Sequence, residues 1–281
     1  MGHTIRGELE GIIPDSLLDR VPSSFDILGS RRKAVAIIEV PEELSSYRGE
    51  IGDAITRVHK NVESVLERTS KRRGKYRTRE LEVIYGEKDT EVIHKESGCL
   101  FKLDPQRVYF SARESTERER IVQRTSPGED ILVMFSGVGP FPICITKKVK
   151  GTKATAIEIN HDAHNYCVEN IHLNKVSDYV TPILGDVRDI CPSLGKRYHR
   201  TLMPLPKGAY EFLDVAIPTV RCGGVLHLYH WAPEEDLWTE GEELVYGAVD
   251  RIGRKAEVLD RVKISQYSPR VYKIRLDVMV E

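Results

Sequence analysis

The segment ILVMFSGVGPF, residues 131–141, decides the fold of the larger, C-terminal part of the chain. An apolar strand ends at Phe135, Gly137 and Gly139 permit a tight turn, and Pro140 suits the first turn of a helix. A strand, a glycine turn and a helix in this order are typical of nucleotide-binding α/β sheets. The segment alone is weak support for a ligand site, because a purely structural turn has the same pattern.

Strands and helices alternate after this turn, which predicts a largely parallel, doubly wound sheet. The apolar runs predict strands over 154–159, 179–184, 201–203 and 224–230, helices over 161–173 and 207–220, and a closing hairpin of 258–267 with 271–280. The ligand site of such a sheet lies at the carboxyl ends of its strands.

The N-terminal part predicts a smaller α/β unit. Apolar patterns predict strands over 34–40, 80–84, 91–94, 100–104 and 108–111, and helices over 50–67 and 117–124. We therefore predict two domains, residues 1–95 and residues 96–281.

Composition is that of an ordinary soluble protein of 281 residues, 40% hydrophobic and 30% charged, with a formal net charge of −1. No apolar run reaches the roughly 20 residues of a membrane helix, so no membrane association is expected. The five cysteines are widely spaced without a C-x-x-C pair, which favours a reducing, cytoplasmic location. The scattered histidines and cysteines predict no metal site.

One segment is strongly basic and is a candidate for binding RNA. Within nine residues it contains Lys71, Arg72, Arg73, Lys75, Arg77 and Arg79. A solvated surface loop and a phosphate-binding segment fit this charge equally well.

Two acids follow the predicted strands in an order that suits a nucleoside cofactor. Glu158 ends the second strand, about 20 residues after the glycines, where this fold places an acceptor for ribose hydroxyls. Asp186 follows the third strand, where a carboxylate can accept from an adenine amino group. Solvated acids are common at strand ends, but the glycine turn, Glu158 and Asp186 follow one another in the order that favours a cofactor site.

At this point a resemblance to a known family is evident. FSGVGPF together with AIEIN (156–160), ENIHLNK (169–175), LGDVRD (184–189) and MPLPKGAYEFL (203–213) resembles the archaeal and eukaryotic tRNA (guanine37-N1)-methyltransferase family. Similar segments are YRTRELE (76–82), IHKE (93–96), VYFSARESTERERI (108–121) and QYSPRVYKIRLDV (266–278). The resemblance covers about residues 75–281. It implies a Rossmann-like class I methyltransferase domain after a smaller RNA-contacting α/β domain, S-adenosylmethionine as cofactor, and guanosine 37 in the anticodon stem-loop of tRNA as target.

The resemblance also implies residue roles. Glu117 matches the general base that removes the proton of guanine N1, and Arg77 matches the cation that stabilises charge on O6. The implied cofactor residues are Phe135, Gly137, Val138, Gly139, Pro140, Glu158, Ile159, Asp186, Val187 and Pro204. The implied substrate residues are Arg79, Arg113, Arg118, Pro204 and Pro206. Without the resemblance, Glu117 would be interpreted as a helix residue paired with its neighbours and Arg77 as a phosphate contact.

Two departures from the family pattern keep alternatives open. Val133 stands where the family usually has Asp, and Pro204 where it has Asn, a residue whose side-chain donor proline lacks. An altered pocket could accept the tricyclic base 4-demethylwyosine for methylation at C7, alone or in addition to N1 methylation, as in enzymes of the family's wyosine branch. Aminocarboxypropyl transfer, a non-catalytic RNA-binding protein and a small-molecule methyltransferase are the further alternatives. We expect a monomer.

Overall fold

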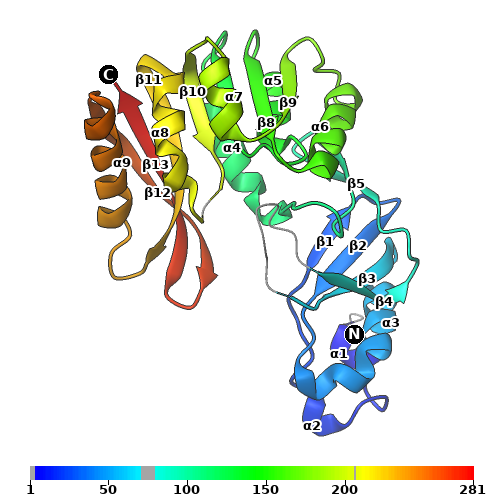
Figure 1. Ribbon diagram of the computed structural model, residues 1–281. Coiled ribbons are helices and arrows are strands. Elements are labelled where there is room, and N and C mark those ends of the chain that lie inside the picture. Colours follow the sequence, from blue (N-terminus) through cyan, green and yellow to red (C-terminus); the bar gives the residue numbers. More distant parts are fainter. Residues whose placement is uncertain (1–3, 71–79, 206) are drawn as a thin grey trace. The chain divides into compact units, whose positions relative to one another are not determined.

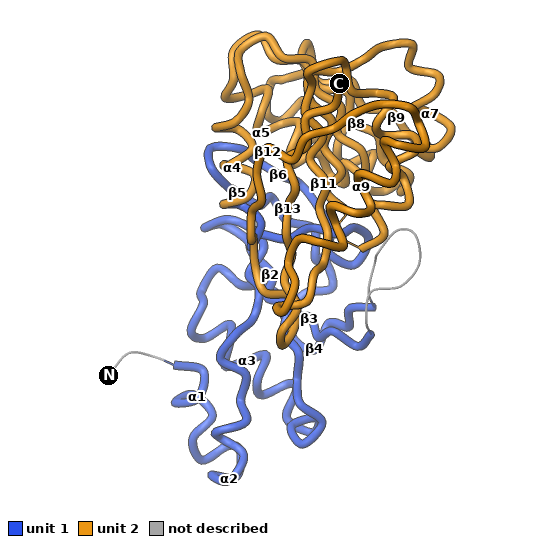
Figure 2. The backbone as a smooth tube through the Cα atoms, turned by 90° about the vertical axis from the view of Figure 1, so that its left-hand side faces the viewer, with its two compact units in different colours: residues 1–115 blue, residues 116–281 orange. Residues whose placement is uncertain are grey.

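The computed structural model describes residues 4–70, 80–205 and 207–281. The chain divides into two compact units, residues 1–115 and residues 116–281 (Figures 1 and 2). Each unit contains its own sheet and its own apolar core.

Unit 1 is built on a four-stranded sheet in the order β1-β2-β3-β4. The parallel strands β2 and β3 are connected through helix α3, which packs against β3 and β4. Ile38, Ile51, Ile55 and Val65 are fully buried in the core between helix and sheet. The elements are α1 (Ile5–Glu8), α2 (Asp15–Leu18), β1 (Asp26–Gly29), β2 (Ala34–Ile38), the 3-10 helix η1 (Glu42–Tyr47), α3 (Arg48–Val58), β3 (Val62–Arg68) and β4 (Leu81–Gly86).

The helix predicted over 50–67 is wrong in its second half. Helix α3 ends at Val58, and residues 62–68 form strand β3. This strand lies between β2 and β4, and consecutive residues 64–67 are buried, so its apolar residues Val62, Val65 and Leu66 do not alternate with polar ones. A short apolar run of this kind also matches helical spacing, which is why periodicity did not separate the two elements.

Residues 92–115 also belong to unit 1. They contain the hairpin of β5 (Val92–Glu96) and β6 (Cys99–Leu103), followed by the 3-10 helix η2 (Ala112–Glu114). The strand predicted over 108–111 is wrong, because Phe110 instead packs its ring against His94 and Phe101. The domain boundary predicted after residue 95 falls inside this hairpin, and the compact units divide after residue 115.

Unit 2 contains a seven-stranded sheet in the order β12-β13-β11-β10-β7-β8-β9. Strands β7 to β11 are parallel, and the closing hairpin β12–β13 is antiparallel, which confirms the predicted Rossmann-like fold. The elements are α4 (Ser115–Arg124), β7 (Asp130–Val133), α5 (Pro140–Lys148), β8 (Lys153–Glu158), α6 (His161–Leu173), β9 (Val180–Leu184), α7 (Val187–Ser193), β10 (Tyr198–Met203), η3 (Ala209–Phe212), α8 (Leu213–Ala216), η4 (Ile217–Thr219), β11 (Val220–Pro233), α9 (Thr239–Ile252), β12 (Ala256–Ser268) and β13 (Val271–Val280).

The helix predicted over 207–220 is present only as three short helical pieces, η3, α8 and η4. Gly208 adopts a left-handed conformation before the first piece, and Pro218, which has no N–H to donate, lies in the last. Helices α7 and α9 were not predicted.

The two faces of β11 and β13 differ in chemistry. Leu228 and Leu276 point to an apolar core that includes Val245 of α9. On the opposite face the same strands carry buried polar residues, among them Tyr229 and Arg275. Alternating side chains of a strand point to opposite faces, so one sheet separates an apolar core from a polar layer.

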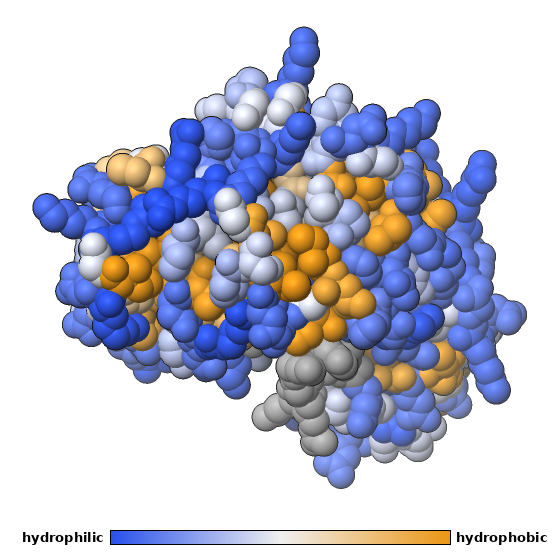
Figure 3. All heavy atoms as spheres, turned by 45° about the horizontal axis from the view of Figure 1, so that its top comes forward, coloured by the Kyte–Doolittle hydropathy of each residue, from blue (hydrophilic) through white to orange (hydrophobic). Residues whose placement is uncertain are grey.

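The outer surface is mainly polar. Hydrophilic side chains cover most of the face in Figure 3, with apolar residues in patches between them. Among the described helices, none combines the length and the apolar character needed to cross a bilayer.

Candidate functional site

The turn after β7 has the tight backbone that its glycines predict. Gly137 and Gly139 have φ of 57° and 87°, and Phe135 also has a positive φ of 55°. The N–H of Gly139 donates to the carbonyl of Ser136 at 3.0 Å. A Cβ at Gly139 would lie 2.8 Å from Sγ of Cys167 on α6, so only glycine fits this close approach.

Glu158 fastens this turn to the neighbouring strand. Its carboxylate accepts from the N–H of Gly137 at 2.7 Å and from the N–H of Asn160 at 2.8 Å. The side chain is largely buried, and burial raises the pKa of this carboxyl against the lowering effect of the backbone donors. Carboxylate oxygens have several lone pairs each, so Glu158 could accept from ribose hydroxyls as well as from the turn.

Asp186 lies close to Glu158 because Gly185 donates its N–H to the carbonyl of Glu158 at 2.9 Å. The Asp186 side chain caps helix α7 by accepting from the N–H of Arg188 at 2.9 Å. The next residue, Val187, is buried in the core. The loops after β8 and β9 therefore meet, with both predicted acids at the same edge of the sheet.

The loop after β10 joins the same edge. Phe212 packs edge-on against Phe135, with ring centroids 5.0 Å apart, and the guanidinium of Arg188 lies 4.6 Å from the Phe212 ring. Pro204 is at the centre of a tight turn in which Leu205 donates its N–H to the carbonyl of Met203 at 2.7 Å.

The residues at this edge fit an adenosyl cofactor. Two carboxylates suit hydroxyl and amino donors, and the positive-φ turn leads into the N-terminus of α5, where Pro140 occupies the first turn. Val138 is buried, and its carbonyl accepts from the side chain of Asn170 at 3.0 Å, which fixes the turn on α6.

Glu117 is almost fully buried, with 1% of its surface exposed. Its Oε1 accepts from the hydroxyl of Tyr229 at 2.8 Å and from the guanidinium of Arg275. Its Oε2 lies 3.4 Å from Nη1 of Arg120. Arg275 also binds Asp277 through two hydrogen bonds of 2.6 and 3.1 Å. Glu117 is thus part of a buried ionic arrangement, not the exposed helix acid that its sequence context would otherwise indicate.

This arrangement continues through His227. Its Nδ1 lies 2.5 Å from Asp277, and its Nε2 lies 2.6 Å from Nη1 of Arg200, which in turn pairs with Glu129 at 2.9 Å. Because the guanidinium can only donate, Nε2 of His227 accepts and Nδ1 carries the proton. Burial lowers the pKa of His227 to about 4 despite the opposing effect of Asp277, so the ring is neutral at pH 7.

We call the connected side chains Glu129, Arg200, His227, Asp277, Arg275, Glu117 and Tyr229 the buried ionic network. Its Tyr229 end lies beside the glycine turn. The Tyr229 ring packs 6.1 Å from Phe141, in the first turn of α5. Tyr229 also follows Leu228, which pairs with Met203, the last residue of β10. Glu117 therefore lies at the carboxyl end of the sheet, as the candidate cofactor residues do.

Comparison with known families identifies the family to which this chain belongs. The TRM5/TYW2 methyltransferase domain family matches residues 92–258, more than half of the chain. The chain belongs to the TRM5/TYW2 family. Residues 5–90 match the TYW2 N-terminal domain. The resemblance that the sequence motifs suggested is confirmed.

Three relatives illustrate the range of reactions named for TRM5/TYW2 proteins. The tRNA (guanine(37)-N(1))-methyltransferase Trm5b of Pyrococcus abyssi is 46% identical over 95% of this chain and 78% of its own length. The tRNA(Phe) (4-demethylwyosine(37)-C(7)) aminocarboxypropyltransferase of Methanocaldococcus jannaschii is 33% identical over 87% and 95%. The tRNA (guanine(37)-N(1))/4-demethylwyosine(37)-methyltransferase Taw22 of Nanoarchaeum equitans is 29% identical over 91% and 99%.

Solved structures of TRM5/TYW2 proteins have the same fold. The complex of aTrm5 and tRNALeu matches with a TM-score of 0.83 and 32% identity, covering 99% of this chain and 78% of that one. TYW2 of P. horikoshii in complex with MeSAdo matches with a TM-score of 0.83 and 28% identity, covering 98% and 97%.

The predicted RNA-contacting residues have different environments. Arg77, Arg79, Pro206 and the rest of the basic segment 71–79 lie outside the described residues. Arg113 is exposed and pairs with Asp26 of unit 1. Arg118 is buried beside Glu117 in α4, so in this conformation it is not presented to a ligand in solvent.

Sequence reasoning missed the partners of Glu117. Tyr229 and Arg275 are more than a hundred residues away along the chain. The one available signal was the pattern KIRLD at 273–277, where charged and apolar residues alternate in a predicted strand. Such alternation indicates one polar face, but it does not identify what covers that face.

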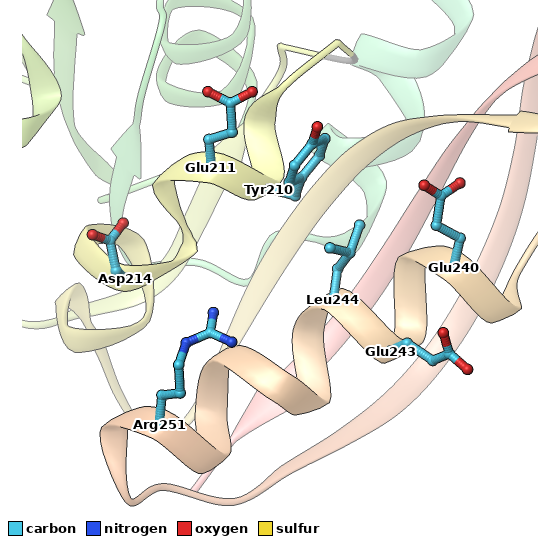
Figure 4. A pocket seen from close by; sticks show the side chains of 7 residues that line it. All are labelled: Tyr210, Glu211, Asp214, Glu240, Glu243, Leu244 and Arg251. Atoms are coloured by element: carbon cyan, nitrogen blue, oxygen red, sulfur yellow. The ribbon is translucent and has the colours of Figure 1, made fainter.

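A separate cavity of about 520 Å³ lies between α9 and the pieces η3 and α8. Tyr210 and Leu244 face each other across it (Figure 4). The cavity is mainly acidic, which disfavours a phosphate ligand. Its lining residues are Tyr210, Glu211, Asp214, Glu240, Glu243, Leu244 and Arg251. None of them is among the predicted site residues.

Proposed function

We propose that this protein is a tRNA methyltransferase that transfers a methyl group from S-adenosylmethionine to N1 of guanosine 37. The observation that carries the proposal is the position of Glu117. It is held by Tyr229 at the carboxyl end of the sheet, next to the first turn of α5 and the glycine turn. Membership of the TRM5/TYW2 family and the relative Trm5b support the same reaction.

In this proposal Glu158 and Asp186 bind the adenosyl part of the cofactor. S-adenosylmethionine, when bound, supplies an electrophilic sulfonium methyl group. The donors of Arg275 and Tyr229 fix Oε1 of Glu117. Oε2, which lies 3.4 Å from Nη1 of Arg120, takes the proton of guanine N1, whose lone pair then attacks the methyl carbon. Arg77, by resemblance, stabilises the negative charge that develops on O6.

A second candidate reaction is the modification of C7 of the tricyclic base at position 37. The match of residues 5–90 to the TYW2 N-terminal domain favours it, as does the similarity to the aminocarboxypropyltransferase and to Taw22. Pro204 in place of the family asparagine is consistent with a pocket for a larger base.

The deciding experiment uses two labelled forms of S-adenosylmethionine with tRNA carrying either guanosine or 4-demethylwyosine at position 37. One form carries the label in the methyl group and the other in the carboxyl carbon. Nucleosides from the digested tRNA are then identified by mass spectrometry. Methyl label in 1-methylguanosine is expected. Carboxyl label in the product would instead indicate aminocarboxypropyl transfer, and no label in either tRNA would refute both reactions.

The role of Glu117 is tested with Glu117→Gln, which preserves the shape of the side chain. The expected loss in methyl transfer is about 10²-fold or more, with cofactor binding retained. Glu119→Gln is the matched control, because Glu119 is on the same helix, is partly exposed and pairs with Lys148. Equal activities of the two variants would remove Glu117 from the catalytic role.

The chain is proposed to act as a monomer in the cytoplasm. None of the five cysteines, all within the described residues, forms a disulfide, which supports a reducing compartment. Light scattering at working concentrations tests the monomer.

A further inference from the structure

An exposed aromatic stack lies near the tip of the β12–β13 hairpin. The rings of Trp231, on β11, and Tyr267, on β12, are parallel within 24°, with centroids 3.7 Å apart. Tyr267 is 53% exposed. Its ring is therefore already ordered by Trp231 on one side, while much of the residue remains accessible to a ligand.

This stack is on the same face of the sheet as the buried ionic network. Trp231 and Tyr229 are two residues apart on β11, so their side chains share a face and lie about 7 Å apart along the strand. Lys273 pairs in register with Trp231, and its Nζ lies 4.9 Å from the Tyr229 ring. The stack therefore continues the line of side chains that leads from Glu117 towards solvent.

The stack is also beyond the end of the parallel strands. Strand β10 ends at Met203, which pairs with Leu228, three residues before Trp231. The β12–β13 hairpin extends further than the neighbouring strands (Figure 1). A ligand on Tyr267 would thus lie at the edge of the sheet that carries the candidate cofactor residues.

An exposed cation lies in the turn of the same hairpin. Arg270, with 70% of its side chain exposed, lies in the hairpin turn and pairs with the exposed Glu235. An exposed ion pair contributes little to stability, so Arg270 can exchange Glu235 for a phosphate at little cost.

We propose that the Trp231–Tyr267 stack is a platform on which an unpaired base of the RNA substrate stacks, next to the nucleotide that is modified. The inference rests on the proposed function for the identity of the RNA. Access to N1 requires that the target base leave its stack, which removes a stacking partner from the adjacent base. Aromatic side chains with nearby cations are the usual protein replacement for such a partner.

The test is the affinity for tRNA of Tyr267→Ala, measured by filter binding at fixed salt without cofactor. A stacked base accounts for roughly tenfold or more in affinity, so about a tenfold loss is expected. Tyr267→Phe keeps the ring and is expected to bind as the wild type does. Tyr246→Ala is the matched control, because Tyr246 is a similarly exposed tyrosine on α9. Circular dichroism melts confirm that each variant is folded.

Two further measurements identify the interaction as stacking. The dependence of affinity on salt should be unchanged in Tyr267→Ala and shallower in Arg270→Ala, because only the second variant removes a cation. A fluorescent adenine analogue beside position 37 should be quenched by the wild type and not by Tyr267→Ala.

A loss smaller than threefold in Tyr267→Ala, or an equal loss in Tyr246→Ala, overturns the platform. The binding readout is independent of product formation. Failure of the platform therefore leaves the labelling result intact, and failure of the proposed reaction leaves the binding result intact.

Discussion

Replacement of Arg275 by methionine tests the buried ionic network. Arg275 is fully buried and holds two carboxylates, Glu117 and Asp277, whose own exposures are 1% and 2%. Removal of one partner from a buried ion pair costs about 3–5 kcal/mol, because the charge that remains is neither solvated nor compensated. For a unit of this size that loss lowers the unfolding midpoint by about 6–20 °C.

The assay is thermal and urea unfolding followed by circular dichroism, at pH 7. The control is Arg270→Met, since Arg270 and its partner Glu235 are both exposed. Its expected effect is within about 0.5 kcal/mol. The double variant Glu117→Gln with Arg275→Met also removes the carboxylate charge that Arg275→Met leaves without a partner. Its free energy of unfolding should therefore be about 1 kcal/mol or more above that of Arg275→Met alone. If Arg275→Met were no more destabilising than Arg270→Met, the network would not be a stabilising unit.

Three other outcomes follow from the structure. Burial holds the pKa of His227 at about 4, below the value near 6.5 of an unfolded chain. Between these pH values the unfolded chain binds more protons than the folded one, so the free energy of unfolding falls as the pH drops from about 6.5 to 4. His227→Gln should flatten this pH dependence, measured by urea titrations at several pH values. Gly139→Ala should lower the free energy of unfolding by about 2–4 kcal/mol in the same titrations, because the backbone at Gly139 is left-handed and an added Cβ would contact Cys167. A neutral effect would contradict this close approach. An aromatic disulfide reagent should label Cys222 rapidly and the four buried thiols only after unfolding, so rapid release of more than one equivalent would contradict the packing.

The order of the strands in unit 2 along the chain, and the helix over 161–173, could be predicted because each of these elements carries its own signal. The helix predicted over 161–173 has the same first and last residues as α6, and Asn160 caps its N-terminal turn. The strand before the glycine turn and the closing hairpin were found for the same reason. Strand β3 was missed because a strand buried on both faces has no alternation to distinguish it from a helix.

The candidate site was only partly accessible to sequence reasoning. Glu158 and Asp186 could be located because both follow strands, and the topology brings strand ends together. The sequence could not identify Tyr229, His227 and Arg275 as residues of the buried ionic network. Their role depends on the side chains of α4 that pack against them in the folded structure. Family resemblance directed attention to Glu117, but it gave no indication of the guanidinium that holds this carboxylate.

The contact between Glu117 and Arg275 joins positions 158 residues apart, and Arg275 lies in the last strand of the chain. During synthesis on the ribosome, α4 emerges long before β13 exists. Until β13 has been synthesised, Glu117 lacks the guanidinium of Arg275 as its buried partner. Synthesis and folding of β13 are therefore needed to assemble the proposed catalytic centre, so chains truncated before Arg275 should be inactive even when their glycine turn is already folded.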